Sequence, residues 1–247
     1  MTRPTTCATQ PVSPATEMAS RLLTSALFAG FCAGLVAALL QFVFVQPVLL
    51  HAELYESGQL VHFGAEPVSA DPDLGGLDLM RDALSVIFSA LVYTGYALVL
   101  TAVMSLAEAS GAAITARTGL IWGVAGFVAV HLAPAVSLPP EVPGVAAADV
   151  FLRQIWWWAT VVATGIALAL LAFGRSWMAW GSAIVLLAAP HLIGAPHPDS
   201  FSGTVPPELA ALFAARALGV GLAAWVLLGS LCGYFWQREG LRQTATA

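Results

Sequence analysis

The stretch LLTSALFAGFCAGLVAALLQFVFVQ, residues 22–46, decides the fold because none of its side chains carries a charge. A helix that rises 1.5 Å per residue crosses roughly 30 Å of bilayer hydrocarbon in about 20 residues. The stretch is longer than the apolar part of a signal peptide, and the segment before it is rich in Thr and Pro rather than basic. We therefore expect a retained membrane-spanning helix.

The rest of the chain repeats this pattern. The sequence is 59% hydrophobic and 9% charged, whereas soluble domains carry about 25% charged residues. The continuous apolar runs exclude the alternating strands of a membrane β-barrel. The sequence thus predicts an all-α, polytopic helical membrane bundle with six transmembrane helices, with five as the alternative. The further spans are expected at 83–106, 118–136, 155–173, 177–195 and 215–236.

Three parts of the chain follow from these spans. We expect a disordered N-terminal tail over 1–20, a single transmembrane domain over 21–238 with an acidic extracytoplasmic loop at 47–82, and a C-terminal tail over 239–247. Six spans place both termini on one side of the membrane. If that side is the cytoplasm, six arginines lie inside and three outside, as the positive-inside rule requires. The outer face then carries three arginines and eleven acids, a net charge of −8, which would concentrate cations there.

Pairs of glycines at four-residue spacing predict close contacts between helices. These pairs are Gly30/Gly34, Gly119/Gly123 and Gly229/Gly233. They fit a compact bundle and would also suit contacts between copies of the chain in a homo-oligomer. The tryptophans fall near the expected span ends, where we interpret them as an aromatic belt at the membrane surfaces.

Residue types that are absent exclude several functions. The chain has no lysine, so it has neither a Walker-type P-loop nor a Schiff-base lysine. Cys7, Cys32 and Cys232 are far apart and predict no disulfide framework or cysteine-rich metal site. No HExxH-like pattern supports a membrane metalloenzyme. We therefore expect no enzymatic activity, no prosthetic group and no nucleic-acid partner.

Two histidines lie at matched depth inside the expected bundle. His131 and His191 follow the starts of their spans by thirteen and fourteen residues, which places both roughly 20 Å above the inner end. Ionisable side chains at this depth are costly unless they have a partner, and they often mark an ion pathway. Each lies beside a proline, in HLAP (131–134) and APHLIGAP (189–196), which frees a backbone carbonyl. The alternative is that both histidines hydrogen-bond within the bundle and brace it.

The outer loops supply further ligand candidates. LPPEVPG (138–144) and VPPELAA (205–211) follow the two histidines and indicate a repeated hairpin. In HAELYE (51–56), a helix would place Glu53 and Glu56 on one face and turn His51 away from them. Imidazole and carboxylate together suit Co²⁺, Ni²⁺ or Zn²⁺. The predicted metal ligands are His131, His191, Glu53, Glu56 and His51, whereas His62 and His197 are expected to be solvated.

The combination of these segments resembles one family. RLLTSALFAGFCAGLVAALLQ (21–41), AELYE (52–56), HLAPAVSLPPEVPG (131–144) and PHLIGAPHP (190–198) with VPPELAALFAARAL (205–218) resemble the CbtA family of predicted cobalt transporter subunits, from about residue 20 to 236. His51, His62 and His197 fall where the family is expected to vary. The family is described with five spans, whereas the charge distribution here favours six. The positions that match the family pattern are Glu53, Glu56, His131, Pro139, Pro140, Glu141, Pro143, Gly144, His191, Gly194, Ala195 and Pro196.

The resemblance implies a multi-pass protein of the bacterial inner (plasma) membrane that serves cobalt supply for cobalamin synthesis. It also implies a small, histidine-containing, single-span CbtB-type partner subunit. We predict a membrane permease subunit that takes up cobalt, or nickel or zinc, through His and Glu ligands in the outer half of a lipid-embedded bundle. The alternative function is a non-transporting scaffold or assembly subunit whose histidines are structural.

Overall fold

The computed structural model describes residues 13–62 and 68–246, and all long elements in these ranges are helices. The predicted all-α, polytopic fold is confirmed. Two of the helical rods contain a π-helical turn. The elements are α1 (Pro14–Leu40), the π turn η1 (Gln41–Val45), α2 (Gln46–Glu56), α3 (Leu79–Ala109), α4 (Ala116–Phe127), the π turn η2 (Val128–Leu132), α5 (Ala133–Ala135), α6 (Val150–Phe173), α7 (Trp177–Ile193) and α8 (Pro207–Thr246).

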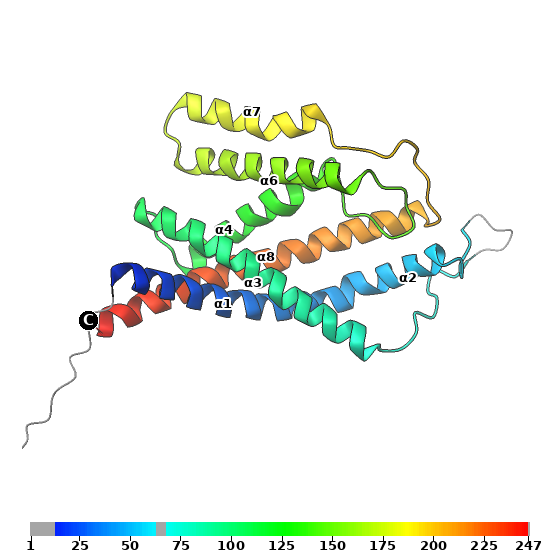
Figure 1. Ribbon diagram of the computed structural model, residues 1–247, viewed down its shortest axis with the longest axis horizontal. Coiled ribbons are helices and arrows are strands. Elements are labelled where there is room, and N and C mark those ends of the chain that lie inside the picture. The colour runs from blue at the N-terminus through cyan, green and yellow to red at the C-terminus, as the bar shows by residue number, and fades with distance from the viewer. Residues whose placement is uncertain (1–12, 63–67, 247) are drawn as a thin grey trace, which may run out of the picture.

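The segments α1–η1–α2 and α4–η2–α5 are each continuous, so the described part of the chain forms six helical rods that run alternately in opposite directions (Figure 1). Residues 13 and 246, where the description of the chain begins and ends, therefore lie on the same side of the molecule. The side-chain amide of Gln243 donates to the carbonyl of Glu17 over 3.0 Å and joins the two ends. Within the described residues, five helices are long and apolar enough to cross a membrane. The sixth, α7, has 17 residues and is about 26 Å long. It runs back beside α6, so that α8 starts at the opposite end from both termini (Figure 1).

Helix ends differ from the predicted boundaries because polar caps extend the helices. Ser13 accepts a hydrogen bond from the Thr16 backbone N–H, and Pro14 starts α1. The expected tail over 1–20 is therefore helical from Pro14, and residues 1–12 lie outside the described residues. The expected tail over 239–247 is helical as far as Thr246. The expected loop at 47–82 is narrower, since α2 continues to Glu56 and Asp78 caps α3.

Small residues let α1, α3, α4 and α8 pack closely, as the sequence predicted. A Cβ added at Gly30 or Gly34 would overlap the α3 backbone at Thr94 or Ala90. One added at Gly119 would overlap the Gly229 carbonyl of α8. The central core that results includes the fully buried side chains of Met104, Leu228 and Trp236.

Arg21 connects three helices at the end of this core that lies nearest the two termini. Its guanidinium donates to both carboxylate oxygens of Glu108, at 3.1 and 3.3 Å, and to the carbonyl of Trp236 at 3.0 Å. It also lies 3.9 Å from the centroid of the Trp236 ring. These contacts join α1, α3 and α8. Trp236 is fully buried, so the belt interpretation is wrong for this residue.

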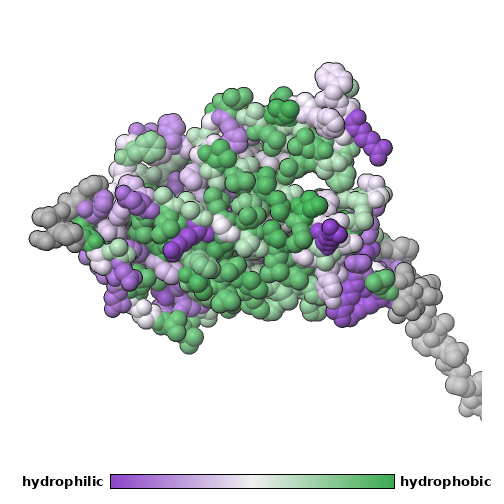
Figure 2. All heavy atoms as spheres, turned by 180° about the vertical axis from the view of Figure 1, so that it is seen from behind, coloured by the Kyte–Doolittle hydropathy of each residue, from purple (hydrophilic) through white to green (hydrophobic). Residues whose placement is uncertain are grey.

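The α6–α7 hairpin lies beside the core (Figure 1). Among the described elements, α7 packs against α6 alone, while α6 also contacts α4, η2 and α5. Most of α7 is exposed, and its buried residues are Ala183 and Pro190. Figure 2 shows the broad hydrophobic band that covers the middle of the molecule, with hydrophilic residues gathered toward its two ends. These features make the chain a multi-pass membrane protein.

A second, smaller core forms at the end opposite both termini, which is named the outer end after its expected orientation. Its buried residues are Ala52, Tyr55, Val142 and Val205. The two Pro-Pro-Glu loops meet here in an antiparallel bridge, in which Ala146 donates to Ser202 over 2.8 Å and Thr204 donates to Gly144 over 3.1 Å. The two loops that look alike in the sequence are thus in direct contact.

Candidate functional site

His131 lies in the π turn η2, where three helices meet. Pro134 has no N–H, and the Ala133 N–H reaches back five residues to Val128. The imidazole is surrounded by Tyr96 of α3, Phe127 of α4 and Trp225 of α8, with ring centroids 6.0 to 6.2 Å apart. Its Nε2 is buried and has no hydrogen-bond partner among the described residues.

An orphaned polar atom at this depth has a physical cost, because water is not there to replace the missing hydrogen bond. Buried polar groups normally have a partner, and an exception calls for an explanation such as an unseen ion. Single π turns inside α-helices often occur at functional sites. His131 is therefore the strongest functional candidate among the five predicted ligands.

His191, by contrast, is engaged in contacts that join helices. Its Nδ1 lies 2.9 Å from Ser137 Oγ, and its ring meets the edge of Trp156 at 6.1 Å. The Trp156 indole N–H donates to the Pro190 carbonyl over 3.1 Å. Trp156 is buried, so it too departs from the aromatic-belt interpretation. His191 and His131 share no neighbour in these contacts, because they face different helices.

The ligand candidates of HAELYE point in different directions, as the helix geometry predicted. Glu53 and Glu56 are exposed, and Glu56 lies against Gly144 of the first Pro-Pro-Glu loop. His51 stacks on Tyr55 at 5.5 Å, and its Nε2 is buried without a partner among the described residues.

The five predicted ligands do not form one cluster in this conformation. Within residues 13–62 and 68–246, no group of three or more His, Cys, Asp or Glu side chains is close enough to hold a metal ion. The metal role of His131, His191, Glu53, Glu56 and His51 stays a prediction, and their convergence would require a rearrangement or additional ligands.

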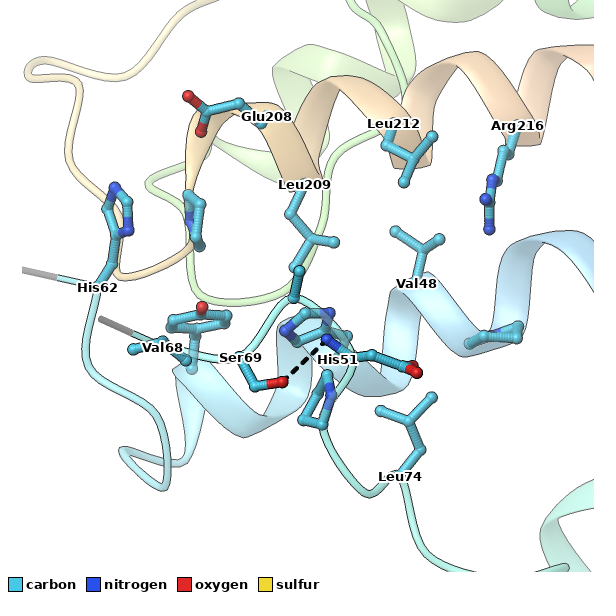
Figure 3. Close-up of a pocket in the computed structure, with 16 residues that line it drawn as sticks. Val48, His51, His62, Val68, Ser69, Leu74, Glu208, Leu209, Leu212 and Arg216 are labelled. Atoms are coloured by element: carbon cyan, nitrogen blue, oxygen red, sulfur yellow. Dashed lines mark hydrogen bonds between the residues drawn. The ribbon is translucent and has the colours of Figure 1, made fainter. Parts of the chain in front are cut away.

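A pocket of about 720 Å³ opens at the outer end between α2, the segment 68–74 and the start of α8. His51 rises from α2 into this space, and Glu208, Leu212 and Arg216 line the facing side of α8 (Figure 3). The backbone N–H of Asp71 donates to Ser69 Oγ over 3.2 Å, which shapes the loop wall. A mostly apolar lining with a few convergent polar groups is typical of small-molecule sites.

Sequence reasoning missed Arg216, which it counted only among the outer charges. The Arg216 guanidinium donates to the carbonyl of Phe44 in η1 over 3.2 Å. It forms no ion pair with a carboxylate of the described residues, whereas Arg21, Arg81 and Arg153 each do. The pattern ELAALFAARAL (208–218) contains the signal, since one arginine interrupts an apolar helix.

The remaining histidines lie at the outer end. His62 contributes to the wall of the same pocket. His197 is exposed, and its Nδ1 lies 3.2 Å from the adjacent Pro198 carbonyl. Their expected solvated character agrees with this exposure.

Residues 19–237 match a family described as probable cobalt transporter subunit (CbtA). The match covers nearly the whole chain. The chain belongs to the CbtA family. No curated protein and no solved structure shows a match to it.

Several positions that match the CbtA pattern build the outer end of the fold. Glu141 pairs with Arg153 at 2.7 Å and so attaches the first Pro-Pro-Glu loop to α6. Gly144 and Gly194 have φ angles of 79° and 91°, in the left-handed region that favours glycine. Of the positions that the resemblance singled out, these three thus shape the loops, whereas His131 is a buried polar group without a partner among the described residues.

Proposed function

We propose that this CbtA chain is the membrane permease subunit for uptake of a divalent transition-metal ion, with Co²⁺ as the first candidate and Ni²⁺ and Zn²⁺ as the alternatives. The observation that carries the proposal is the unpartnered Nε2 of His131, enclosed by α3, α4 and α8 inside a membrane bundle. Neutral imidazole is a good ligand for these ions. The family description as a cobalt transporter subunit supports the choice of ion.

His131 is the proposed central ligand. His191, Glu53, Glu56 and His51 are the remaining candidates on this chain, and they line the outer half of the bundle. Because the described conformation does not gather them, we propose that ligands change as the ion moves inward. No prosthetic group and no catalytic step enter this proposal.

The word subunit in the family description implies a complex. We propose that the partner is a small, single-span CbtB-type protein. The complex then lies in a bacterial inner membrane, with both termini of this chain in the cytoplasm. The cobalt that it takes up serves cobalamin synthesis. The exposed apolar surface of the α6–α7 hairpin leaves room for lipid and for a partner helix.

Uptake of radioactive cobalt tests the transport function. Cells that express this chain with its partner should accumulate cobalt, and His131→Ala should abolish the uptake because the central imidazole is lost. His197→Ala is the matched control, since His197 is exposed and should leave uptake unchanged. Normal uptake by the His131 variant at equal protein level would contradict the assignment.

A scaffold role is the second candidate, and the contacts of His191 favour it. The imidazole joins Ser137 and Trp156, so it braces α7 against α6 and the end of α5. We expect His191→Ala to lower the free energy of unfolding by about 1 kcal/mol, because one hydrogen bond is lost. The midpoint of thermal unfolding should fall accordingly. If the whole chain is only a scaffold, cobalt should not shift the midpoint of the wild-type protein in a thermal unfolding experiment.

A further inference from the structure

Arg216 places a positive charge in the outer pocket and forms no ion pair with a described carboxylate. It lies nine residues after Pro207, the first residue of α8, and therefore about 14 Å along that helix. Its described hydrogen bond to the Phe44 carbonyl occupies Nη1. A guanidinium has five N–H donors, so a bound carboxylate could still form the two parallel hydrogen bonds that arginine favours.

The opposite side of the pocket suits a cation. His51 Nε2 is buried there without a described partner. Asp71 is close enough to His51 to act on it electrostatically, and Glu208 lies at the edge of the pocket (Figure 3). One pocket therefore presents an anion-binding group on α8 and cation-binding groups on α2 and the 68–74 segment.

The size of the pocket argues against a simple hydrated ion. Six waters occupy roughly 180 Å³ at about 30 Å³ each, whereas the pocket measures about 720 Å³. Its walls also include apolar side chains that gain nothing from a hydrated ion, among them Val48, Leu209 and Leu212. Both features favour a larger ligand with carbon atoms and with charges of both signs.

We propose that the outer pocket binds the divalent cation as a complex with a small chelator that carries a free carboxylate. Arg216 binds the carboxylate, and the metal faces His51 and Asp71. The inference rests on the proposed transport function and names the form in which the ion first binds.

Calorimetry on the purified full chain in lipid nanodiscs tests this inference. The titrants are cobalt citrate, citrate alone, Co²⁺ alone, and cobalt with a polyamine chelator of similar size that has no carboxylate. Cobalt citrate should bind at least roughly tenfold more tightly than each of the other three titrants. Arg216→Gln should lower the affinity for cobalt citrate by roughly tenfold or more. The affinity for Co²⁺ without a chelator should not change.

Matched variants separate binding from folding. Arg153→Gln removes an outer arginine that is already paired with Glu141, so it should keep the affinity for cobalt citrate. Arg216→Lys keeps the charge without the two-pronged geometry and should give an intermediate affinity. His51→Gln changes the opposite wall and should also lower the affinity for cobalt citrate. This variant provides a second test if Arg216→Gln does not fold.

Equal affinities for cobalt citrate and Co²⁺ alone would overturn the inference, as would an unchanged affinity for cobalt citrate in both Arg216→Gln and His51→Gln. Uptake assays distinguish this failure from failure of the proposed function. Cells that accumulate Co²⁺ but not cobalt citrate contradict only the chelate proposal. Cells that accumulate cobalt in neither form contradict the transport function itself.

Discussion

At the scale of single residues, the proposed chemistry depends on the protonation state of imidazole. Only neutral imidazole can donate a lone pair to a metal ion, so protons compete with cobalt. Free imidazole side chains titrate at about pH 6.5, and glutamate side chains at about pH 4.3. A site built from imidazole ligands is therefore expected to lose cobalt on acidification.

We expect cobalt affinity to fall as the pH drops, because protons then compete with cobalt for the imidazole nitrogen of His131. Calorimetry at a series of pH values measures the effect, and His131→Ala combined with His191→Ala should abolish binding. His197→Ala should retain the full pH profile. Cobalt binding that persists in the double variant would contradict the assignment and would leave Glu53 and Glu56 as the ligands to test next.

The depth of the two buried histidines could be predicted from the sequence, whereas their neighbours could not. The depth of His131 and His191 follows from counting residues along a helix, because each adds 1.5 Å. The rotation of each helix about its axis depends on tertiary packing, which the sequence alone did not determine. As a result, two histidines of equal depth face different neighbours, and Tyr96 and Trp225 could not be predicted as the neighbours of His131.

At the scale of elements, glycine contacts determine how closely α4 and α8 approach. A Cβ added at Gly229 would lie 2.6 Å from the Gly123 Cα and would overlap the Gly119 carbonyl. No described atom lies within 4 Å of a Cβ added at Gly219 of the same helix. The two glycines thus form a matched pair, one at an interface and one facing open space.

We expect Gly229→Ala to destabilise the protein by about 1–3 kcal/mol, because the added methyl group pushes α4 and α8 apart. Gly219→Ala should be neutral or stabilising by up to about 1 kcal/mol, since alanine favours helix more than glycine does. Thermal unfolding of the two variants in the same detergent measures the difference. Equal midpoints would show that the α4–α8 contact is not a close one.

Hydropathy predicted the helices well and their internal turns not at all. Long apolar runs are sufficient to place a helix in a membrane, so the six rods appear where the sequence indicated. Pro134 predicted a freed carbonyl near His131, whereas the helix there adopts a π turn just before the proline. The first helix does the same before Pro47, where the sequence predicted no irregularity. A π turn depends on which hydrogen bonds the surrounding helices permit, and the sequence pattern alone does not contain that information.

At the scale of the whole molecule, the two hydrophobic cores support two different candidate sites. The central core of α1, α3, α4 and α8 holds His131, and the outer core joins α2 to both Pro-Pro-Glu loops beside the pocket. Within the described elements, the α6–α7 hairpin packs on the central core through α6, and the contact of His191 with Ser137 holds α7 beside the end of the α4–α5 segment. This arrangement places the pocket at the end where the sequence positions most acids, so a cation complex would meet an attractive field before it meets the bundle.

The topology of the whole chain depends on α7, since it is the shortest of the six rods. If α7 crosses the membrane, Arg175 before it and Ser200 after it lie on opposite sides. If it does not, both lie on the same side, and the family's described five spans would apply. Both residues are exposed, so a cysteine at either position is accessible to reagents.

We expect six crossings with both termini in the cytoplasm. In a background with Cys7, Cys32 and Cys232 replaced by serine or alanine, a membrane-impermeant maleimide should label Ser200→Cys in intact cells. It should label Arg175→Cys only after the cells are permeabilised, because the charge distribution keeps that loop inside. Labelling of neither cysteine in intact cells would mean that α7 does not cross and that its two ends lie in the cytoplasm, whereas labelling of Arg175→Cys alone would invert the orientation and put the acidic pocket on the cytoplasmic side.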